Sequence, residues 1–207
     1  MAHSPSLPFA VMLLAGGYSR RMGQDKAWLE WRGGPLWQHQ IETLIRLPAQ
    51  RRLISCREEQ KLQDTPHFAG WEWLFDPAGD EQGPMGAVAR SLRLVNLPMV
   101  VLAVDMPFMT AEFLQRELIA GSTAGRGRFF RSTEGIEPMA ALYVPEMLPV
   151  MEGRLSRGEL GLQRMIEEAE VVNLAKIRTL KEEERAFFAN LNTPGEWEQS
   201  RDSRRLG

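Results

Sequence analysis

Residues 11–26 read VMLLAGGYSRRMGQDK, and the expected fold of the chain follows from them. They begin inside an apolar run, residues 9–14, which has the length and composition of a buried strand. The run ends at Ala15-Gly16-Gly17, where two residues without a Cβ atom allow the backbone to turn sharply and to approach a ligand closely. The sequence therefore predicts a strand followed by a glycine loop that faces a ligand.

Positively charged side chains follow the glycine loop. The polar and flexible positions here are Ser19, Arg20, Arg21, Gly23 and Lys26. Backbone N–H groups of such a loop can line a phosphate-sized concavity, and Arg and Lys supply charge that neutral donors lack. A tight strand-to-helix connection with solvated arginines would explain the two glycines alone, but the complete string favours a polyanion site. We expect a nucleoside triphosphate, with Arg21 and Lys26 neutralising its phosphate oxygens.

Two better-known phosphate loops do not match the spacing of this segment. A P-loop requires G-x-x-x-x-G-K-[ST], whereas GQDKA at residues 23–27 separates the glycine from the lysine and places alanine after it. A dinucleotide-binding fingerprint requires G-x-G-x-x-G after the strand, and AGGYSRRMG does not contain it. The loop therefore belongs to neither of these two classes of nucleotide site.

The composition is that of an ordinary globular protein. The chain has 207 residues, of which 43% are hydrophobic and 25% charged, and its formal net charge is −2. This balance argues against a nucleic-acid-binding protein, which would show a strongly basic face. The single cysteine, Cys56, excludes an internal disulfide and a cysteine-cluster metal site. With no apolar run of about 18 residues and no signal-peptide pattern, the chain is expected in the cytoplasm.

Strand-like apolar runs alternate with helical segments along the chain. Helices are expected to begin at Pro35, at Pro84 and after the N-cap Thr110, and CREEQK at residues 56–61 is expected to start a solvated helix. Strands are expected at residues 53–55, 71–75, 99–104, 128–131, 139–144, 171–174 and 187–191. Further helices are expected at residues 145–152, at residues 160–169 and after Thr193-Pro194, and residues 121–137 are expected to form a loop around the 128–131 strand.

This alternation defines the expected fold class. Strands separated by helices imply a mostly parallel sheet with right-handed crossovers. We expect a single three-layer α/β/α domain with a Rossmann-like sheet that spans residues 9–197, and flexible termini at residues 1–8 and 198–207. Neither an internal repeat nor an interdomain linker is recognisable in the sequence.

Several polar residues directly follow predicted strands. In open α/β sheets, ligands bind beyond the carboxyl ends of the strands, and the glycine loop, Ser55, Asp76 and Asp105 all stand at such ends. Asp105, in V-D-M-P, could be a loop carboxylate or a helix cap. A carboxylate straight after an apolar strand is also where a hard cation would bridge protein and phosphate. We therefore expect these residues to share one site.

The segment LAGGYSRRMGQDKAWLEWRGGPLW, residues 14–37, resembles the N-terminal motif of the molybdenum cofactor guanylyltransferases, also described as molybdopterin-guanine dinucleotide biosynthesis protein A. The L-A-G-G, R-M-G and D-K elements have the spacing of that family. Residues 82–86, QGPMG, resemble its G-P-L-x-G stretch, and residues 190–194, NLNTP, resemble its N-x-N-T-P stretch. The resemblance covers most of residues 9–197 and implies a fold of the nucleotide-diphospho-sugar transferase type.

The resemblance also implies a reaction and a set of site residues. The reaction is transfer of GMP from GTP to the terminal phosphate of molybdopterin cofactor, with release of pyrophosphate. The implied catalytic residues are Arg21, Lys26 and Asp105, with Asp105 as the ligand of a Mg²⁺ cofactor. The implied nucleotide-binding residues are Leu14, Ala15, Gly16, Gly17, Lys26, Ser55, Asp76 and Asp105. The second substrate is expected at Gly83, Pro84, Gly86, Asn190 and Asn192.

Two positions depart from the family pattern, and other activities stay open. Residues 55–57, SCR, stand where the family commonly carries Asn, and Glu137-Pro138 stands where His often precedes the proline. Alternatives are a cytidylyltransferase or a sugar or alditol nucleotidyltransferase of the same group, or a catalytically silent partner that binds nucleotide or cofactor. We expect GTP rather than CTP, and molybdoenzymes or cofactor-delivery proteins as further partners.

Overall fold

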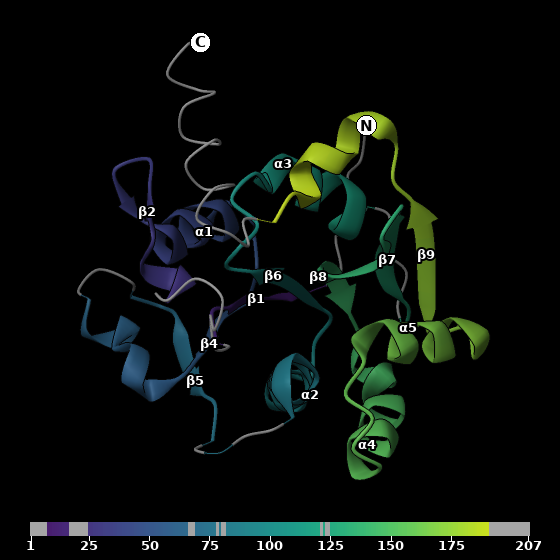
Figure 1. Ribbon diagram of the computed structural model, residues 1–207. Coiled ribbons are helices and arrows are strands. Elements are labelled where there is room, and N and C mark those ends of the chain that lie inside the picture. The colour runs from purple at the N-terminus through teal and green to yellow at the C-terminus, as the bar shows by residue number, and fades with distance from the viewer. Residues whose placement is uncertain are drawn as a thin grey trace.

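The molecule is built on one seven-stranded sheet. The structure is a computed structural model, and it describes residues 8–16, 25–65, 69–77, 79, 82–120, 122 and 125–190. The strands stand in the order β5-β4-β1-β6-β8-β7-β9. Their bounds are β1 Ala10–Leu14, β4 Arg51–Cys56, β5 Glu72–Phe75, β6 Met99–Ala103, β7 Gly127–Ser132, β8 Gly135–Tyr143 and β9 Ala175–Thr179. Figure 1 shows β1 and β6 near the middle, with β5 and β9 at opposite edges.

The sheet is mostly parallel, as the sequence predicts. β1 pairs in parallel with β4 and β6, β4 pairs in parallel with β5, and β7 pairs in parallel with β9. The exception is β8, which runs antiparallel to both of its neighbours, β6 and β7. The carboxyl ends of β5, β4, β1 and β6 therefore share one edge of the sheet, where ligands of α/β proteins bind.

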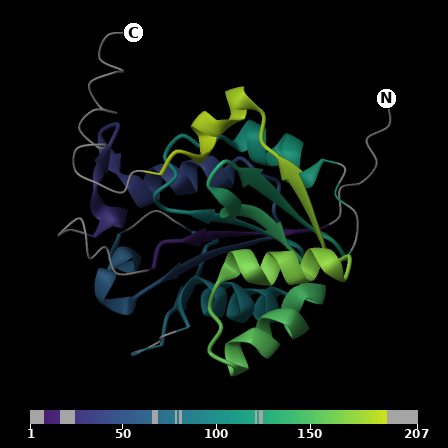
Figure 2. The ribbon, with the colours of Figure 1, turned by 45° about the vertical axis from the view of Figure 1, so that its right-hand side comes forward.

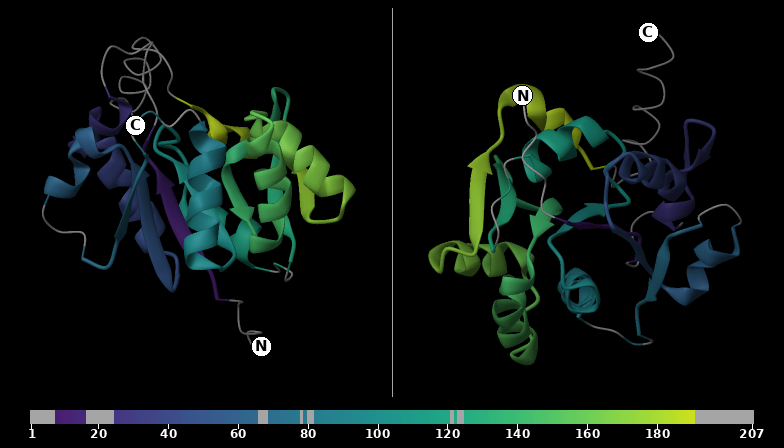
Figure 3. Two further views of the ribbon diagram at one scale, coloured as in Figure 1. Left: turned by 90° about the horizontal axis from the view of Figure 1, so that it is seen from below. Right: turned by 180° about the vertical axis from the view of Figure 1, so that it is seen from behind.

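Helices cover both faces of the sheet. One layer contains α1 (Leu36–Ile45), α3 (Ala111–Leu114), the π-helical turn η4 (Gln115–Ile119) and the 3-10 helix η6 (Glu182–Phe188). The other contains α2 (Gly83–Val95), α4 (Leu148–Ser156) and α5 (Leu162–Val171). Figure 2 shows the sheet between the two layers, and the left panel of Figure 3 shows α2 running beside α4 and α5. The expected three-layer α/β/α architecture is confirmed.

Side-chain alternation along the central strands divides the core into two halves. In β1, Val11 and Leu13 pack into the α1 and α3 layer, whereas Met12 and Leu14 pack into the α2 layer. All five residues of β1 and all five of β6 are buried, so both strands need apolar side chains on both faces. This is the reason that strands 9–14 and 99–104 appear in the sequence as continuous apolar runs.

Short elements connect the layers around the glycine loop. The 3-10 helix η1 (Lys26–Trp28) leads into the two-stranded hairpin of β2 (Glu30–Trp31) and β3 (Gly34–Pro35), which precedes α1. Pro35 was expected as the first helical residue, but it pairs with Glu30 and lies one position before the helix. After β4 the chain forms the 3-10 helices η2 (Glu58–Gln60) and η3 (Leu62–Asp64), and before α4 it forms η5 (Pro145–Met147).

The expected loop at residues 121–137 is wrong over its second half. β7 and β8 form a hairpin in which Arg131 pairs with Ile136 and Ser132 with Gly135. Gly135 has a φ of +131°, which favours glycine at the end of the turn. The polar run through residues 131–135 is therefore the tip of a hairpin, and the predicted 139–144 strand is the second half of a longer one.

Two strands predicted near the C-terminus are also wrong. Val171 closes α5 and is 86% exposed, and the strand comes later, as β9. The two consecutive valines favour a strand locally, but burial of Met165, Ile166 and Ala169 favours continuation of the helix. At residues 187–191, the described part is the end of η6, where Phe188 is buried against Phe113. Leu191 and the helix expected after Thr193-Pro194 lie outside the described residues.

None of the helices in the described part of the chain is both long enough and apolar enough to cross a membrane.

Candidate functional site

A pocket of about 240 Å³ lies at the edge of the sheet where β1 and β6 end. Leu14, Ala15 and Gly16 line it at the end of β1, and the end of β6 with the segment after it contributes residues 103–105. Its other walls come from Asp25 and Lys26, from Pro84 at the start of α2, from Met139 on β8 and from Asn190. Residues far apart in the sequence therefore meet where an open α/β sheet binds its ligand.

Half of the site residues singled out in the sequence line the pocket. Those that line it are Leu14, Ala15, Gly16, Lys26, Pro84, Asp105 and Asn190. Gly83 and Gly86 flank Pro84 at the start of α2, and Ser55 and Asp76 lie beside Gly16, one and two strands along from β1. Gly17, Arg21 and Asn192 lie outside the described residues, so their predicted roles stay predictions.

Lys26 and Asp105 form an ion pair in the pocket wall. The Lys26 ammonium donates to the Asp105 carboxylate at 2.8 Å, and the two side chains are 17% and 24% exposed. Lys26 begins η1, and Asp105 lies two residues beyond the end of β6. The residual exposure lets both groups reach a ligand in the pocket. A fixed positive charge beside a carboxylate suits a phosphate chain that arrives with a cation.

The start of the glycine loop is anchored on the neighbouring strand. The backbone amides of Ala15 and Gly16 both donate to the Ser55 carbonyl, at 2.8 and 3.1 Å. The sequence predicts that backbone amides of this loop hold phosphate, but the amides of Ala15 and Gly16 already donate to a protein carbonyl. Ser55 is fully buried, and its hydroxyl donates to Asp76 at 3.3 Å. In this structure Ser55 contacts Gly16 and Asp76 rather than the pocket.

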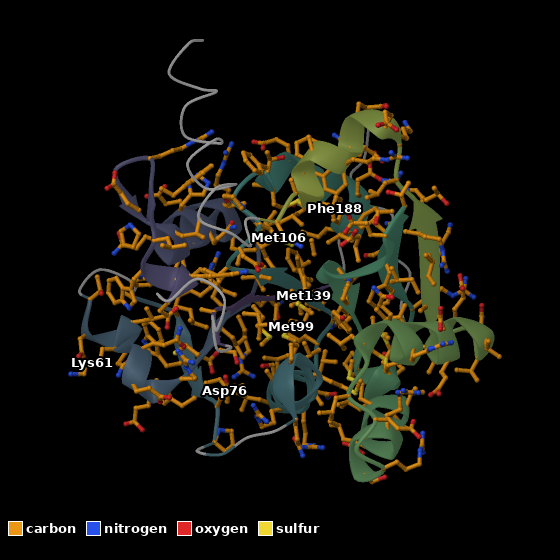
Figure 4. All side chains as sticks on the ribbon, in the orientation of Figure 1. Lys61, Asp76, Met99, Met106, Met139 and Phe188 are labelled. Carbon is orange, nitrogen blue, oxygen red and sulfur yellow. The ribbon has the colours of Figure 1, made fainter. Side chains whose placement is uncertain are left out.

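Asp76 is fixed by a cation that the sequence did not point to. Arg90 on α2 donates to the Asp76 carboxylate at 2.9 Å, and the Asp76 backbone amide donates to the Cys56 carbonyl at 2.8 Å. Figure 4 shows Asp76 toward the β5 side of the molecule and Met139 nearer its middle. Asp76 is thus held beside the glycine loop, at the outer side of the pocket.

Gly16 is required because of this carboxylate. A Cβ atom built on Gly16 would lie 2.3 Å from Oδ2 of Asp76. The carboxylate cannot simply swing away, since Arg90 and Ser55 hold its other oxygen. The close approach of backbone and carboxylate explains the absence of a side chain here without invoking an unusual φ.

Replacing Gly16 by alanine should therefore break the Asp76–Arg90 contact and weaken GTP binding about tenfold, with loss of about 1–2 kcal/mol of unfolding free energy. Isothermal calorimetry and thermal unfolding would measure both effects. Gly153→Ala is the matched control: it lies inside α4, and its Cβ would meet Arg157 at an ordinary 3.6 Å. Equal GTP affinity in the Gly16→Ala variant and wild type would contradict the assignment.

Cys56 is a neutral structural residue in this site. It ends β4 and is fully buried. Burial, together with the nearby carboxylates of Asp76 and Asp25, raises the pKa of its thiol to about 12. The thiol is therefore protonated at neutral pH and supplies no nucleophile.

Four polar residues of the site were not predicted as members of it. Arg90 pairs with Asp76, whereas Asp25, Arg57 and Gln60 form a hydrogen-bonded group between the glycine loop and η2. CREEQK was predicted to start a solvated helix, but Gln60 within it is only 5% exposed. The one available signal was the position of Arg57, a charged residue directly after a strand. A glutamine in a polar run carries no such signal.

Asp105 is a carboxylate of the pocket wall that could bind a metal ion together with a nucleotide. Within the ranges that the structure describes, no group of three or more His, Cys, Asp or Glu side chains could hold one. Asp105 offers a single, partly exposed carboxylate to the pocket. One carboxylate completed by substrate phosphates and water is the usual protein contribution to Mg²⁺ binding in phosphoryl-transfer enzymes. The residues present therefore fit a magnesium–nucleotide complex.

A lysine and a carboxylate stand at the carboxyl edge of this sheet beside a glycine-containing strand end, an arrangement suited to binding a nucleotide, and the comparisons with known proteins show an NTP transferase. The model of the MobA-like NTP transferase domain matches residues 11–174. A probable molybdenum cofactor guanylyltransferase from Opitutus terrae is 38% identical over 208 residues, covering 97% of each chain. The molybdenum cofactor guanylyltransferase of Pseudomonas putida is 30% identical over 161 residues, covering 77% of this chain and 82% of its own.

A solved structure has the same fold. Molybdopterin-guanine dinucleotide biosynthesis protein A from Archaeoglobus fulgidus superposes with a TM-score of 0.78 at 22% identity, covering 96% of this chain and 100% of its own. The family model covers most of the chain, and the relative from Opitutus terrae matches it over nearly its full length. The chain therefore belongs to the molybdenum cofactor guanylyltransferase family. The family resemblance seen in residues 14–37 is thereby confirmed.

Proposed function

We propose that the protein transfers GMP from GTP to the terminal phosphate of molybdopterin cofactor, forming the guanine dinucleotide cofactor and releasing pyrophosphate. The observation that carries the proposal is the Lys26–Asp105 pair at 2.8 Å in the pocket where β1 and β6 end. Its support is the near-full-length similarity to a probable molybdenum cofactor guanylyltransferase. The product would then pass to molybdoenzymes or cofactor-delivery proteins.

The reaction needs little acid–base chemistry from the protein. An oxygen of the terminal phosphate attacks the α-phosphorus of GTP, and the bond from that phosphorus to the α–β bridging oxygen breaks. A phosphate monoester has a second pKa near 6, so the nucleophile is already largely dianionic at pH 7. What opposes the reaction is repulsion between two polyanions and the charge that develops on pyrophosphate. Catalysis is therefore alignment and electrostatic stabilisation.

The residues of the pocket meet these two needs. The Lys26 ammonium neutralises phosphate oxygens, and its contact with Asp105 fixes its direction. The end of β1 and Asp76, held by Arg90, form the side of the site that faces the nucleoside. Mg²⁺ bound by Asp105 would neutralise the triphosphate and the leaving pyrophosphate. Pro84 and Asn190, on other walls of the same pocket, face the second substrate.

The choice of base is tested by calorimetry with GTP and CTP in the presence of Mg²⁺. Asp76 accepts hydrogen bonds only, which suits the N1 and N2 donors of guanine or a ribose hydroxyl. Polar groups left unpaired by the wrong base cost about 1–3 kcal/mol each, so GTP should bind about tenfold or more tightly than CTP. Tighter binding of CTP would overturn the guanylyltransferase assignment and favour the cytidylyltransferase.

A pyrophosphate assay with molybdopterin tests the reaction itself. Each of the four NTPs is incubated with the protein, Mg²⁺ and molybdopterin, and pyrophosphate release is followed. We expect release with GTP that requires molybdopterin. Release only with a sugar phosphate would favour a sugar nucleotidyltransferase, and GTP binding without release would favour a silent binding partner. The three outcomes are distinct, so this assay, run also with a sugar phosphate as acceptor and combined with the calorimetry, separates the candidate functions.

A further inference from the structure

Gln60 occupies a buried position between the two segments that flank residues 17–24. Its side-chain nitrogen donates to the Ala15 carbonyl at 2.9 Å and to Oδ1 of Asp25 at 3.1 Å. Ala15 lies at the end of β1, and Asp25 directly precedes Lys26. Because the Ala15 carbonyl and the Asp25 carboxylate both accept from this one nitrogen, the distance between the two oxygens cannot exceed the sum of the two hydrogen-bond lengths. A single amide thus limits the distance between the end of β1 and the start of η1.

The orientation of this amide is set by its other end. Oε1 of Gln60 accepts from the backbone amide of Arg57 at 2.7 Å, so the nitrogen must face Ala15 and Asp25. The backbone carbonyl of Gln60 also accepts from the indole of Trp28 at 2.9 Å. η1 and η2 are therefore joined at two points, one through a side chain and one through the backbone.

Asp25 is held from three directions. Oδ1 accepts from the Ala27 amide at 3.0 Å, which caps η1, as well as from Gln60. Oδ2 accepts from the Arg57 guanidinium at 2.8 Å. With its carboxylate immobilised in this way, the backbone of the next residue, Lys26, has a defined position. A small displacement there moves the ammonium that contacts Asp105.

We propose that Gln60, supported by Arg57, is a positioning residue that sets the Lys26 ammonium relative to the end of β1. It does not line the pocket, and it acts by fixing Asp25 against Ala15. The inference rests on the proposed phosphate-binding role of Lys26. A residue of η2 then contributes to catalysis, although the sequence of this segment indicates only the start of a solvated helix.

Glutamine is required at this position because it offers a donor and an acceptor at once. In a Gln60→Glu variant, a carboxylate oxygen would face the Ala15 carbonyl and the Asp25 carboxylate, two acceptors, and would repel both. These neighbours raise the pKa of the introduced carboxyl. Of the other charged groups on the same segment, Arg57 contacts the Asp25 carboxylate, and Glu59 pairs with Arg57. Protonation restores one donor, so acid should partly restore the contact.

The test compares pyrophosphate release by wild type, Gln60→Glu and Gln63→Glu between pH 8 and pH 6. At pH 8 we expect kcat of Gln60→Glu to be lower by about tenfold, with a smaller change in KM for GTP, because a misplaced Lys26 acts mainly on the transition state. The ratio to wild type should rise toward one as the pH falls. Using the ratio removes the titration of the phosphate nucleophile. Gln63→Glu is the control: Gln63 lies half-buried in the neighbouring helix η3, and its side-chain nitrogen contacts the Glu58 carbonyl rather than Ala15 or Asp25, so this variant should follow wild type throughout.

A second variant covers the case in which Gln60→Glu does not fold. Gln60→Met has similar volume and no charge, and should lower kcat about tenfold at every pH without recovery in acid. Wild-type kcat in Gln60→Met would overturn the proposal, as would a Gln60→Glu profile parallel to that of wild type.

An activity-independent readout separates this inference from the proposed function. The rate at which an amine-reactive reagent modifies Lys26, mapped by mass spectrometry, should rise in both Gln60 variants relative to the exposed Lys176. If wild type releases no pyrophosphate, the proposed function fails, but the positioning of Lys26 is still tested by this rate. An unchanged Lys26 rate in both variants would overturn the positioning role whatever the activity.

Discussion

Replacing Asp105 by asparagine should lower kcat for GMP transfer by about 10² or more while leaving the fold almost unchanged. Asparagine keeps the size of the side chain and can still accept a hydrogen bond from Lys26, which now lies 2.8 Å away. It removes the carboxylate charge that we propose as the Mg²⁺ ligand. The loss should be largest at limiting Mg²⁺, because weaker metal binding can be offset in part by mass action.

The control for this variant is Asp64→Asn, which removes the same charge from an exposed residue of η3. It should show wild-type activity at every Mg²⁺ concentration. Thermal unfolding of both variants should stay within a few degrees of wild type. Near-normal turnover of Asp105→Asn at limiting Mg²⁺ would contradict the assignment of Asp105 as the metal ligand. A large drop in thermal stability would instead indicate that the Lys26–Asp105 pair is mainly structural.

The central part of the fold could be predicted because its strands are buried on both faces. β1 and β6 lie in the middle of the sheet, so their apolar runs are uninterrupted and end abruptly at the polar residues of the site. Asp105 could be placed in the site from this pattern alone. Toward the β9 edge, β7 carries the half-buried Arg128 and the exposed Arg131 among buried residues, and the local sequence predicted the strand but not the hairpin that it forms with β8.

Helix ends near the C-terminus could not be predicted because distant packing decides them. Val171 is in a helix since the preceding turns of α5 are buried against the sheet, although two consecutive valines favour a strand. Phe187 and Phe188 are in a 3-10 helix because Phe113, far away in the sequence, forms the surface on which they pack. Neither contact is visible in the residues that surround these positions.

The site itself was predictable to the extent that it follows strand ends. Ala15, Asp76 and Asp105 all stand there, and strand assignment alone brings them together. The residues that fix them could not be found in this way. Gln60 is 45 positions from Ala15, and Arg90 reaches Asp76 from a helix that begins after the loop. Such supporting contacts depend on the folded arrangement of η2 and α2, which periodicity does not encode.

Replacing Lys26 by alanine should reduce kcat/KM for GTP by about 10² or more, the second large effect expected in this protein. The change removes the ammonium that neutralises phosphate, and it leaves the Asp105 carboxylate in the pocket wall without its 2.8 Å partner, where it repels the triphosphate. Both effects oppose binding and the transition state, so KM should rise as kcat falls. Lys26→Arg should recover only part of the loss, because the planar guanidinium of arginine does not fit the place of the compact lysine ammonium.

Lys176→Ala is the control for these lysine variants, since it removes the same charge from an exposed position on β9. It should retain the kcat/KM of wild type. The pair Lys26→Ala and Asp105→Asn should also be non-additive, because each single change already disrupts the same contact. Unchanged kcat/KM in Lys26→Ala would refute the phosphate-binding role. Strict additivity of the two changes would show that Lys26 and Asp105 act independently, and the pocket would then need a different arrangement of its charges around the nucleotide.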